Sequence, residues 1–182
     1  MKPLFTVHAG EFLAGDFIQR HFKNVNVWIP TKDVGVDLLV SDAKNKHTVS
    51  LQVKFSRDFS VTHERKEFRG SFRASGWWSL NKEKIEKSKA DYWLFVLVGF
   101  AHKTEDYIII KPEELLAKLE TLRGNTTIFQ TYLCVTAHKN CWETRGLGRK
   151  ELASIINDEY RDDVRDFSQH LDNWGPIRAL NE

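Results

Sequence analysis

Residues 36–55 read VDLLVSDAKNKHTVSLQVKF and decide how the N-terminal half of the chain folds. Apolar and polar side chains alternate at both ends of this stretch, which is the period of a β-strand with one buried face. The face predicted to be buried carries Val36, Leu38, Val40, Val49, Leu51, Val53 and Phe55. The opposite face carries Asp37 on the first strand, and Gln52 and Lys54 on the second.

The loop between the two strands, residues 42–47, is short and polar, which predicts a β-hairpin. If its turn is symmetric about Lys44-Asn45, Asp37 lies directly opposite Gln52. A carboxylate, an amide oxygen and the ammonium of Lys54 then converge on one patch of the sheet. Oxygen ligands of this kind suit Mg²⁺, and a neighbouring lysine suits a phosphate.

Gly35-Val36-Asp37 followed by Gln52-Val53-Lys54 resembles the active-site motif of the PD-(D/E)XK nuclease superfamily. In that family an acid on one strand precedes a Glu- or Gln-x-Lys on the next strand, and an upstream helix often carries a Glu. The proline that usually precedes the acid is absent here, and Gln52 offers a carbonyl oxygen without a charge. The resemblance implies a restriction-endonuclease-like core over about residues 6–98.

The same resemblance implies an enzyme that hydrolyses phosphodiester bonds in DNA with Mg²⁺, or with Mn²⁺ as the alternative metal. It implies that Asp37, the Gln52 side chain and the Val53 carbonyl hold the metal, and that Glu11 ligates it directly or through water. Lys54 would orient or help to deprotonate the attacking water, or offset the negative charge that develops. The alternative is a nucleic-acid-binding protein that keeps the nuclease fold and does not cleave, which the neutral Gln52 keeps open.

A first helix is predicted from Thr6, a suitable N-cap, to about Lys23. Its apolar stripe consists of Val7, Ala14, Ile18 and Phe22. Glu11 falls inside this stripe, where a carboxylate is costly unless it is paired or bound to a metal. A salt-bridged or partly exposed glutamate at the edge of the stripe is the alternative. The resemblance expects an acid on this helix and therefore favours a metal ligand.

Charge is distributed unevenly along the chain. From Lys54 to Ala90 there are ten Lys or Arg against five Asp or Glu, and from Glu151 to Glu182 there are eight acids against three bases. A basic binding face is one interpretation of this asymmetry, and two solvated surfaces are the other. The side chains expected to contact DNA phosphates are Arg57, Lys66, Arg69 and Arg73. The acidic C-terminal segment is expected to face away from the DNA. A flap whose aromatic residues pack on the sheet is the alternative for residues 56–76.

The remaining pattern predicts an α/β fold, with a mixed central β-sheet flanked by helices. The expected elements are strands at 25–29, 91–98, 107–110 and 127–135, a basic helix over 80–90 capped by Ser79, and helices at 113–122 and from 151 to about 157. Asp33 is a rival for the motif acid, but only Asp37 has the register that faces Gln52. Cys134, His138 and Cys141 provide three zinc ligands where structural sites need four, so a buried strand Cys and a loop Cys are expected.

The chain of 182 residues is long enough for one domain with a real core, to which residues 99–182 would be C-terminal additions. Six Trp and twelve Phe argue against disorder. No apolar run reaches membrane-spanning length, no signal peptide is visible, and two cysteines make no disulfide framework, so a cytoplasmic protein is expected. Apolar residues in the acidic C-terminal segment are expected to pack against the domain, or against a second subunit in a homodimer.

Overall fold

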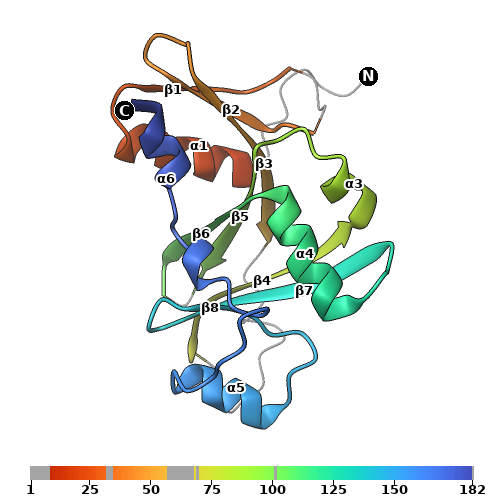
Figure 1. Ribbon diagram of the computed structural model, residues 1–182. Coiled ribbons are helices and arrows are strands. Elements are labelled where there is room, and N and C mark those ends of the chain that lie inside the picture. Colours follow the sequence, from red (N-terminus) through yellow and green to blue (C-terminus); the bar gives the residue numbers. More distant parts are fainter. Residues whose placement is uncertain (1–8, 32–34, 57–67, 69, 101, 182) are drawn as a thin grey trace.

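The computed structural model describes residues 9–31, 35–56, 68, 70–100 and 102–181. Its main sheet has five strands in the order β1-β2-β3-β5-β6 (Figure 1). These strands are β1 (Val25–Trp28), β2 (Leu38–Asp42), β3 (Thr48–Ser56), β5 (Tyr92–Gly99) and β6 (Thr104–Ile110). β3 and β5 run parallel, and the other neighbouring strands in this sheet are antiparallel. The predicted mixed sheet of an α/β protein is therefore confirmed.

The hairpin of β2 and β3 has the predicted register. Its paired residues are Leu38–Leu51, Leu39–Ser50, Val40–Val49 and Ser41–Thr48, so the turn is symmetric about Lys44-Asn45. The Asp42 carboxylate closes the turn by accepting the backbone N–H groups of Lys44 and Lys46, each at 2.9 Å. The bond from Lys46 is the main cause of the lowered pKa of Asp42. Asn45 adopts a positive φ of 55°, which asparagine tolerates better than most residues.

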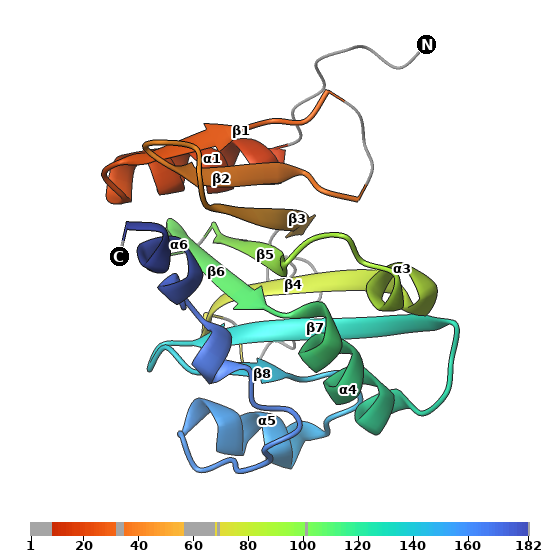
Figure 2. The same ribbon diagram turned by 45° about the horizontal axis from the view of Figure 1, so that its top comes forward.

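A second sheet has the order β4-β7-β8, and Figure 2 shows it below the main sheet. Its antiparallel strands are β4 (Phe72–Asn81), β7 (Ile128–Thr136) and β8 (Cys141–Glu143). β4 corrects the prediction that Ser79 caps a helix. Residues 72–76 form a strand where a flap was the alternative, and Phe72 is buried as that alternative expected. Leu80 pairs with Phe129 of β7, and both are buried in the core, so strand pairing continues to Asn81. The helix α3 is short, Lys82–Glu86, and Asn81 caps it by accepting the Lys84 N–H at 3.1 Å.

The elements form layers that Figure 2 shows from the side. Helix α1 (Ala9–His21) covers one face of the main sheet together with the C-terminal α6 (Gly175–Arg178) and the 3-10 turn η3 (Ala179–Asn181). The second sheet and α4 (Pro112–Arg123) lie against the other face. β5 is therefore covered on both sides, with Leu94 and Val96 facing α1 and Trp93, Phe95 and Leu97 facing the second sheet. This position explains its nearly continuous apolar sequence.

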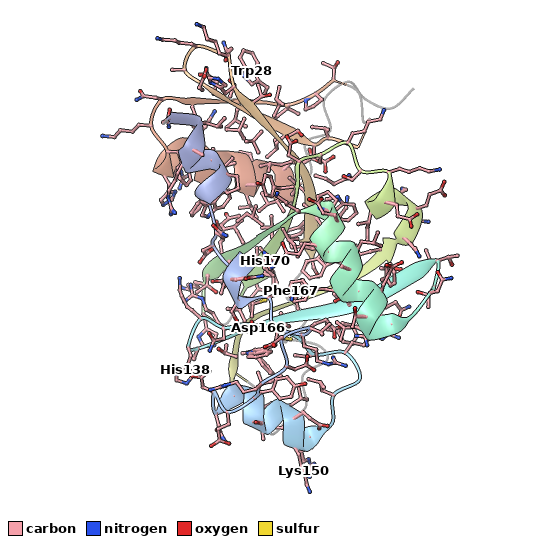
Figure 3. The ribbon with its side chains drawn as sticks, viewed as in Figure 1. Trp28, His138, Lys150, Asp166, Phe167 and His170 are labelled. Carbon is pink, nitrogen blue, oxygen red and sulfur yellow. The ribbon has the colours of Figure 1, made fainter. Side chains whose placement is uncertain are left out.

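Residues after 98 are integral to the same domain and are not the separate C-terminal additions that the sequence had suggested. β6 adds the fifth strand of the main sheet, and Tyr107 from this strand is fully buried. Trp174 stacks on Phe17 of α1 with 4.9 Å between ring centroids. Phe167, beside the 3-10 turn η2 (Ser168–His170), is also fully buried (Figure 3). The expectation that the acidic C-terminal segment packs against the domain is confirmed for these two aromatic side chains.

The remaining helix, α5 (Arg149–Ile156), begins two residues before its predicted start and packs on the outer face of the second sheet through a small cluster around Phe72, Trp142 and Ile155. Figure 3 shows Lys150 of α5 and Trp28 of β1 at opposite ends of the molecule.

Candidate active site

A cavity of about 960 Å³ lies where the first turn of α1, the end of β3 and the helix α3 meet. Its lining includes the five side chains or backbone groups that the motif singles out, namely Glu11, Asp37, Gln52, Val53 and Lys54. These residues come from a helix, from the segment that enters β2 and from β3. The fold thus brings together around one space residues that are far apart in the sequence.

Asp37 lies one residue before β2, where the ladder between β2 and β3 ends. Its N–H donates to the Leu51 carbonyl at 2.8 Å, and its Oδ2 accepts the Val53 N–H at 2.7 Å. The carboxylate thereby accepts the hydrogen bond of the Val53 N–H, which no backbone carbonyl of β2 reaches beyond the end of the ladder. Within the described residues, Asp37 Oδ1 accepts no hydrogen bond. One carboxylate oxygen therefore fixes the side chain, and the other is available to a ligand.

Gln52 and the Val53 carbonyl supply further oxygen atoms beside Asp37. A Cβ atom on Gly35 would lie 4.0 Å from Gln52 Oε1, so the amide lies near the segment that leads into Asp37. The amide makes no hydrogen bond to any residue in the described ranges. Val53 belongs to β3, and a strand residue directs its N–H and its C=O to the same edge, so the Val53 carbonyl faces the same side as the N–H that bonds Asp37. That side is the one that Asp37 occupies.

Lys54 is positioned by the neighbouring strand β5. Its Nζ lies 5.1 Å from the centroid of the Trp93 ring, within the range of a cation–π interaction. Trp93 pairs with Gln52 across β3 and β5 and is almost fully buried, so the ring is a fixed platform. The ammonium group is thus held over a fixed ring, and Lys54 lines the same cavity as Asp37 and Gln52.

Glu11 reaches the cavity because α1 approaches β3 very closely. A Cβ atom on Gly10 would lie only 2.5 Å from the Cβ of Phe55 and 3.3 Å from Val53 Cγ1, so a glycine is needed at this contact. The next residue, Glu11, consequently stands beside the end of β3. The buried residues of α1 are Gly10, Ala14 and Ile18, and Glu11 is half-buried. It lies at the edge of the apolar stripe and not inside it, which corrects the prediction. Thr6 and Val7 fall outside the described residues.

The oxygen atoms around the cavity fit a hard cation. They belong to two carboxylates, one amide and one backbone carbonyl, the kinds of ligand that Mg²⁺ accepts while it keeps several waters. Over the ranges that the structure describes, no three His, Cys, Asp or Glu residues are grouped so that they could hold a metal. The residues that line the cavity offer oxygen donors and include no histidine or cysteine, so this donor set suits Mg²⁺ or Mn²⁺ better than a metal that needs nitrogen or sulfur ligands.

Sequence reasoning assigned no role to the lysines that line the other side of this cavity. Lys84 of α3 and Lys87 and Lys89 of the following turn all line it, as does Glu83. Glu83 and Lys87 form an ion pair at 2.7 Å, which lowers the pKa of Glu83 and raises that of Lys87. The spacing of the lysines from 82 to 89 was visible in the sequence. Their position beside the motif depends on where β4 ends and α3 begins, which the sequence did not predict.

Arg73 forms an ion pair that the sequence did not predict. Its Nε donates to both carboxylate oxygens of Asp106, at 2.9 and 3.0 Å, and Asp106 is fully buried. Burial raises the pKa of Asp106, and the hydrogen bond from Arg73 opposes this effect. Arg73 therefore compensates a buried carboxylate, a role that the sequence did not predict, and its expected phosphate contact stays a prediction. The other three predicted contacts, Arg57, Lys66 and Arg69, lie outside the described residues, as does Asp33.

The two cysteines have no place in this site. Cys134 and Cys141 are buried on β7 and β8, so Cys141 belongs to a strand and not to the predicted loop. Burial raises the pKa of the Cys141 thiol, which favours its protonated and unreactive form.

Comparison with protein-family models, with curated proteins and with solved structures found no match. The fold and the cavity thus define an α/β protein that gathers carboxylates and lysines at the end of a strand. Among the described elements, no helix has the length and apolar character needed to cross a membrane.

Proposed function

We propose that this protein is a Mg²⁺-dependent DNA endonuclease related to the PD-(D/E)XK superfamily, with a restriction-endonuclease-like core. The observation that carries the proposal is the shared cavity of Glu11, Asp37, Gln52, Val53 and Lys54. The hairpin register and the alternation of side chains in β3 are the reasons that these groups meet. DNA would be the substrate because a phosphodiester group can use a cation and a lysine side by side.

Each residue has a defined task in this proposal. Asp37 Oδ1, Gln52 Oε1 and the Val53 carbonyl would hold Mg²⁺, with Glu11 as a direct ligand or through water. When bound, the metal supplies Lewis acidity and lowers the pKa of a bound water. Lys54, fixed on the Trp93 ring, orients the attacking water or offsets negative charge on the phosphate in the transition state. The hydrogen bond from the Val53 N–H keeps the Asp37 carboxylate in place.

A nucleic-acid-binding protein that does not cleave is the second candidate. Gln52 favours it, because replacing the usual glutamate with a neutral amide removes one charge from the metal site. The cavity would still present Lys54 and the lysines of the α3 region to a phosphate backbone.

Incubation of the purified protein with supercoiled plasmid and with branched DNAs, in Mg²⁺, Mn²⁺ or EDTA, separates the two candidates. We expect nicking in Mg²⁺ or Mn²⁺ and none in EDTA. DNA binding without cleavage in any metal would favour the second candidate. A protein that neither binds nor cleaves these DNAs would contradict both candidates.

A further inference from the structure

The basic residues that follow β4 divide into two groups by their ion pairs. Lys82 is held by Glu120 at 2.5 Å and by Glu86 at 3.8 Å, and the contact with Glu120 is the main cause of its raised pKa. Lys87 is held by Glu83. Lys84 and Lys89, in contrast, form no ion pair with any residue in the described part of the chain, and both are exposed. Two of these lysines are therefore structural, and two carry positive charge that the described part of the fold does not use.

Both unused charges line the candidate active site. The cavity lining holds four lysines, at positions 54, 84, 87 and 89, against three acids, at positions 11, 37 and 83. Glu83 is already paired with Lys87, and Glu11 and Asp37 are the proposed ligands of a divalent cation. The lining therefore carries four positive against three negative side chains even without a cation, and a bound cation would leave Lys84 and Lys89 as excess positive charge. Such an excess attracts a polyanion.

The neighbouring cavity, of about 700 Å³, has the opposite balance. It shares Ser88 and Lys89 with the first cavity, but its charged lining is Glu86, Asp91 and Glu113 against Lys89 and Lys111. A phosphate chain would meet more negative than positive charge there. The charge balance of the two cavities therefore favours a polyanion in the first cavity, which Lys89 shares with Asp37.

We infer that Lys84 and Lys89 bind backbone phosphates of the DNA substrate beside the bond presented to Asp37 and Lys54. The inference rests on the proposed function for the identity of the substrate. It assigns these phosphate contacts to the α3 region and not to Arg73 of β4, whose Nε–H donates to the buried Asp106. Phosphate contacts position the DNA without reading its sequence, so these lysines set affinity and not specificity.

The test compares Lys84→Ala/Lys89→Ala with a control, Lys44→Ala/Lys46→Ala, that removes the same charge. Lys44 and Lys46 are exposed in the hairpin loop, at the opposite end of β3 from Lys54. Binding to a fluorescent DNA duplex is measured by anisotropy in EDTA, from 50 to 200 mM salt. Each lost phosphate contact lowers the slope of log affinity against log salt by about 0.9, so the first variant should lose about 1.8. The wild-type affinity should then fall about tenfold more over this salt range than that of the variant.

The control should keep the wild-type slope, and circular dichroism should show that both variants remain folded. An unchanged slope in Lys84→Ala/Lys89→Ala, or an equal loss in both variants, would overturn the inference. The result is separate from the test of the proposed function, because EDTA prevents metal-dependent cleavage. A selective change of slope in a protein that never cleaves DNA would support the phosphate contacts and contradict the nuclease proposal.

Discussion

Gly10 allows the most direct test of how the first turn of α1 is placed against β3. A Cβ atom at this position would approach Phe55 Cβ to 2.5 Å, about 1 Å less than an ordinary carbon–carbon contact. Overpacking of this kind costs about 1–3 kcal/mol. Replacing a glycine with alanine inside a helix stabilises the helix by about 1 kcal/mol, which offsets part of this cost. We therefore expect Gly10→Ala to be neutral to destabilising, by up to about 2 kcal/mol.

Gly15, in the same helix, provides the matched control. A Cβ atom there would meet Val27 Cγ1 at 3.6 Å, which is an ordinary contact, so Gly15→Ala should keep the gain of about 1 kcal/mol. Thermal and urea unfolding followed by circular dichroism would measure both variants. Each kcal/mol corresponds to about 2–4 °C in Tm for a chain of this size. Equal stabilisation by the two substitutions would show that α1 does not touch β3 at Gly10, and the placement of Glu11 would then be unsupported.

Three further predictions concern the site and the buried ion pair. Gln52→Glu adds a charge to the proposed metal ligands and should lower the Mg²⁺ concentration needed for half-maximal cleavage, whereas Gln52→Ala should raise it. A titration of nicking activity with Mg²⁺ measures both variants. The same Mg²⁺ requirement in both would show that Gln52 is not a ligand. Arg73→Ala leaves the buried Asp106 without its partner and should reduce the free energy of unfolding by about 3 kcal/mol, and urea denaturation that shows no loss would contradict this role. Burial raises the pKa of native Asp106 above the usual 3.8, so its contribution to stability is fully present below pH 3.8 and is lost as pH rises through the native pKa. Asp106→Asn should remove this loss in urea denaturation curves recorded from pH 3.5 upward, and an identical pH profile would argue against it.

The hairpin was predictable because its local sequence and its tertiary environment agree. Alternation in β3 placed Gln52 and Lys54 away from Leu51 and Val53, and the symmetric polar turn fixed the register with β2. A slip of one residue would bury the polar set, so the pattern specifies the pairing strongly. Phe55 belongs to the apolar set, but 36% of its surface is exposed, because β3 runs out to the cavity at this point.

The second sheet could not be predicted with the same means. β4 contains Ala74, Gly76 and Asn81, residue types that are depleted in strands, and its apolar face is recognisable only beside β7. Its length in turn decides where α3 begins, and hence that Lys84 and Lys89 reach the cavity. The ion pair of Arg73 with Asp106 joins residues that are distant in the sequence, and charge counts cannot distinguish such a pair from a free binding group.

The central claim is that Asp37 organises a metal site that cleaves DNA. Asp37→Asn tests it most directly, because the asparagine keeps an oxygen that can accept the Val53 N–H while it removes the charge that a metal needs. The measurement is the rate of plasmid nicking in Mg²⁺ for this variant, for the wild type and for the Lys44→Ala/Lys46→Ala control. We expect the wild type and the control to nick equally, and the variant to be slower by about a hundredfold or more, the scale seen when one group that stabilises a transition state is removed. Wild-type activity in a folded Asp37→Asn protein, or no nicking by the wild type in any divalent metal, would contradict the account.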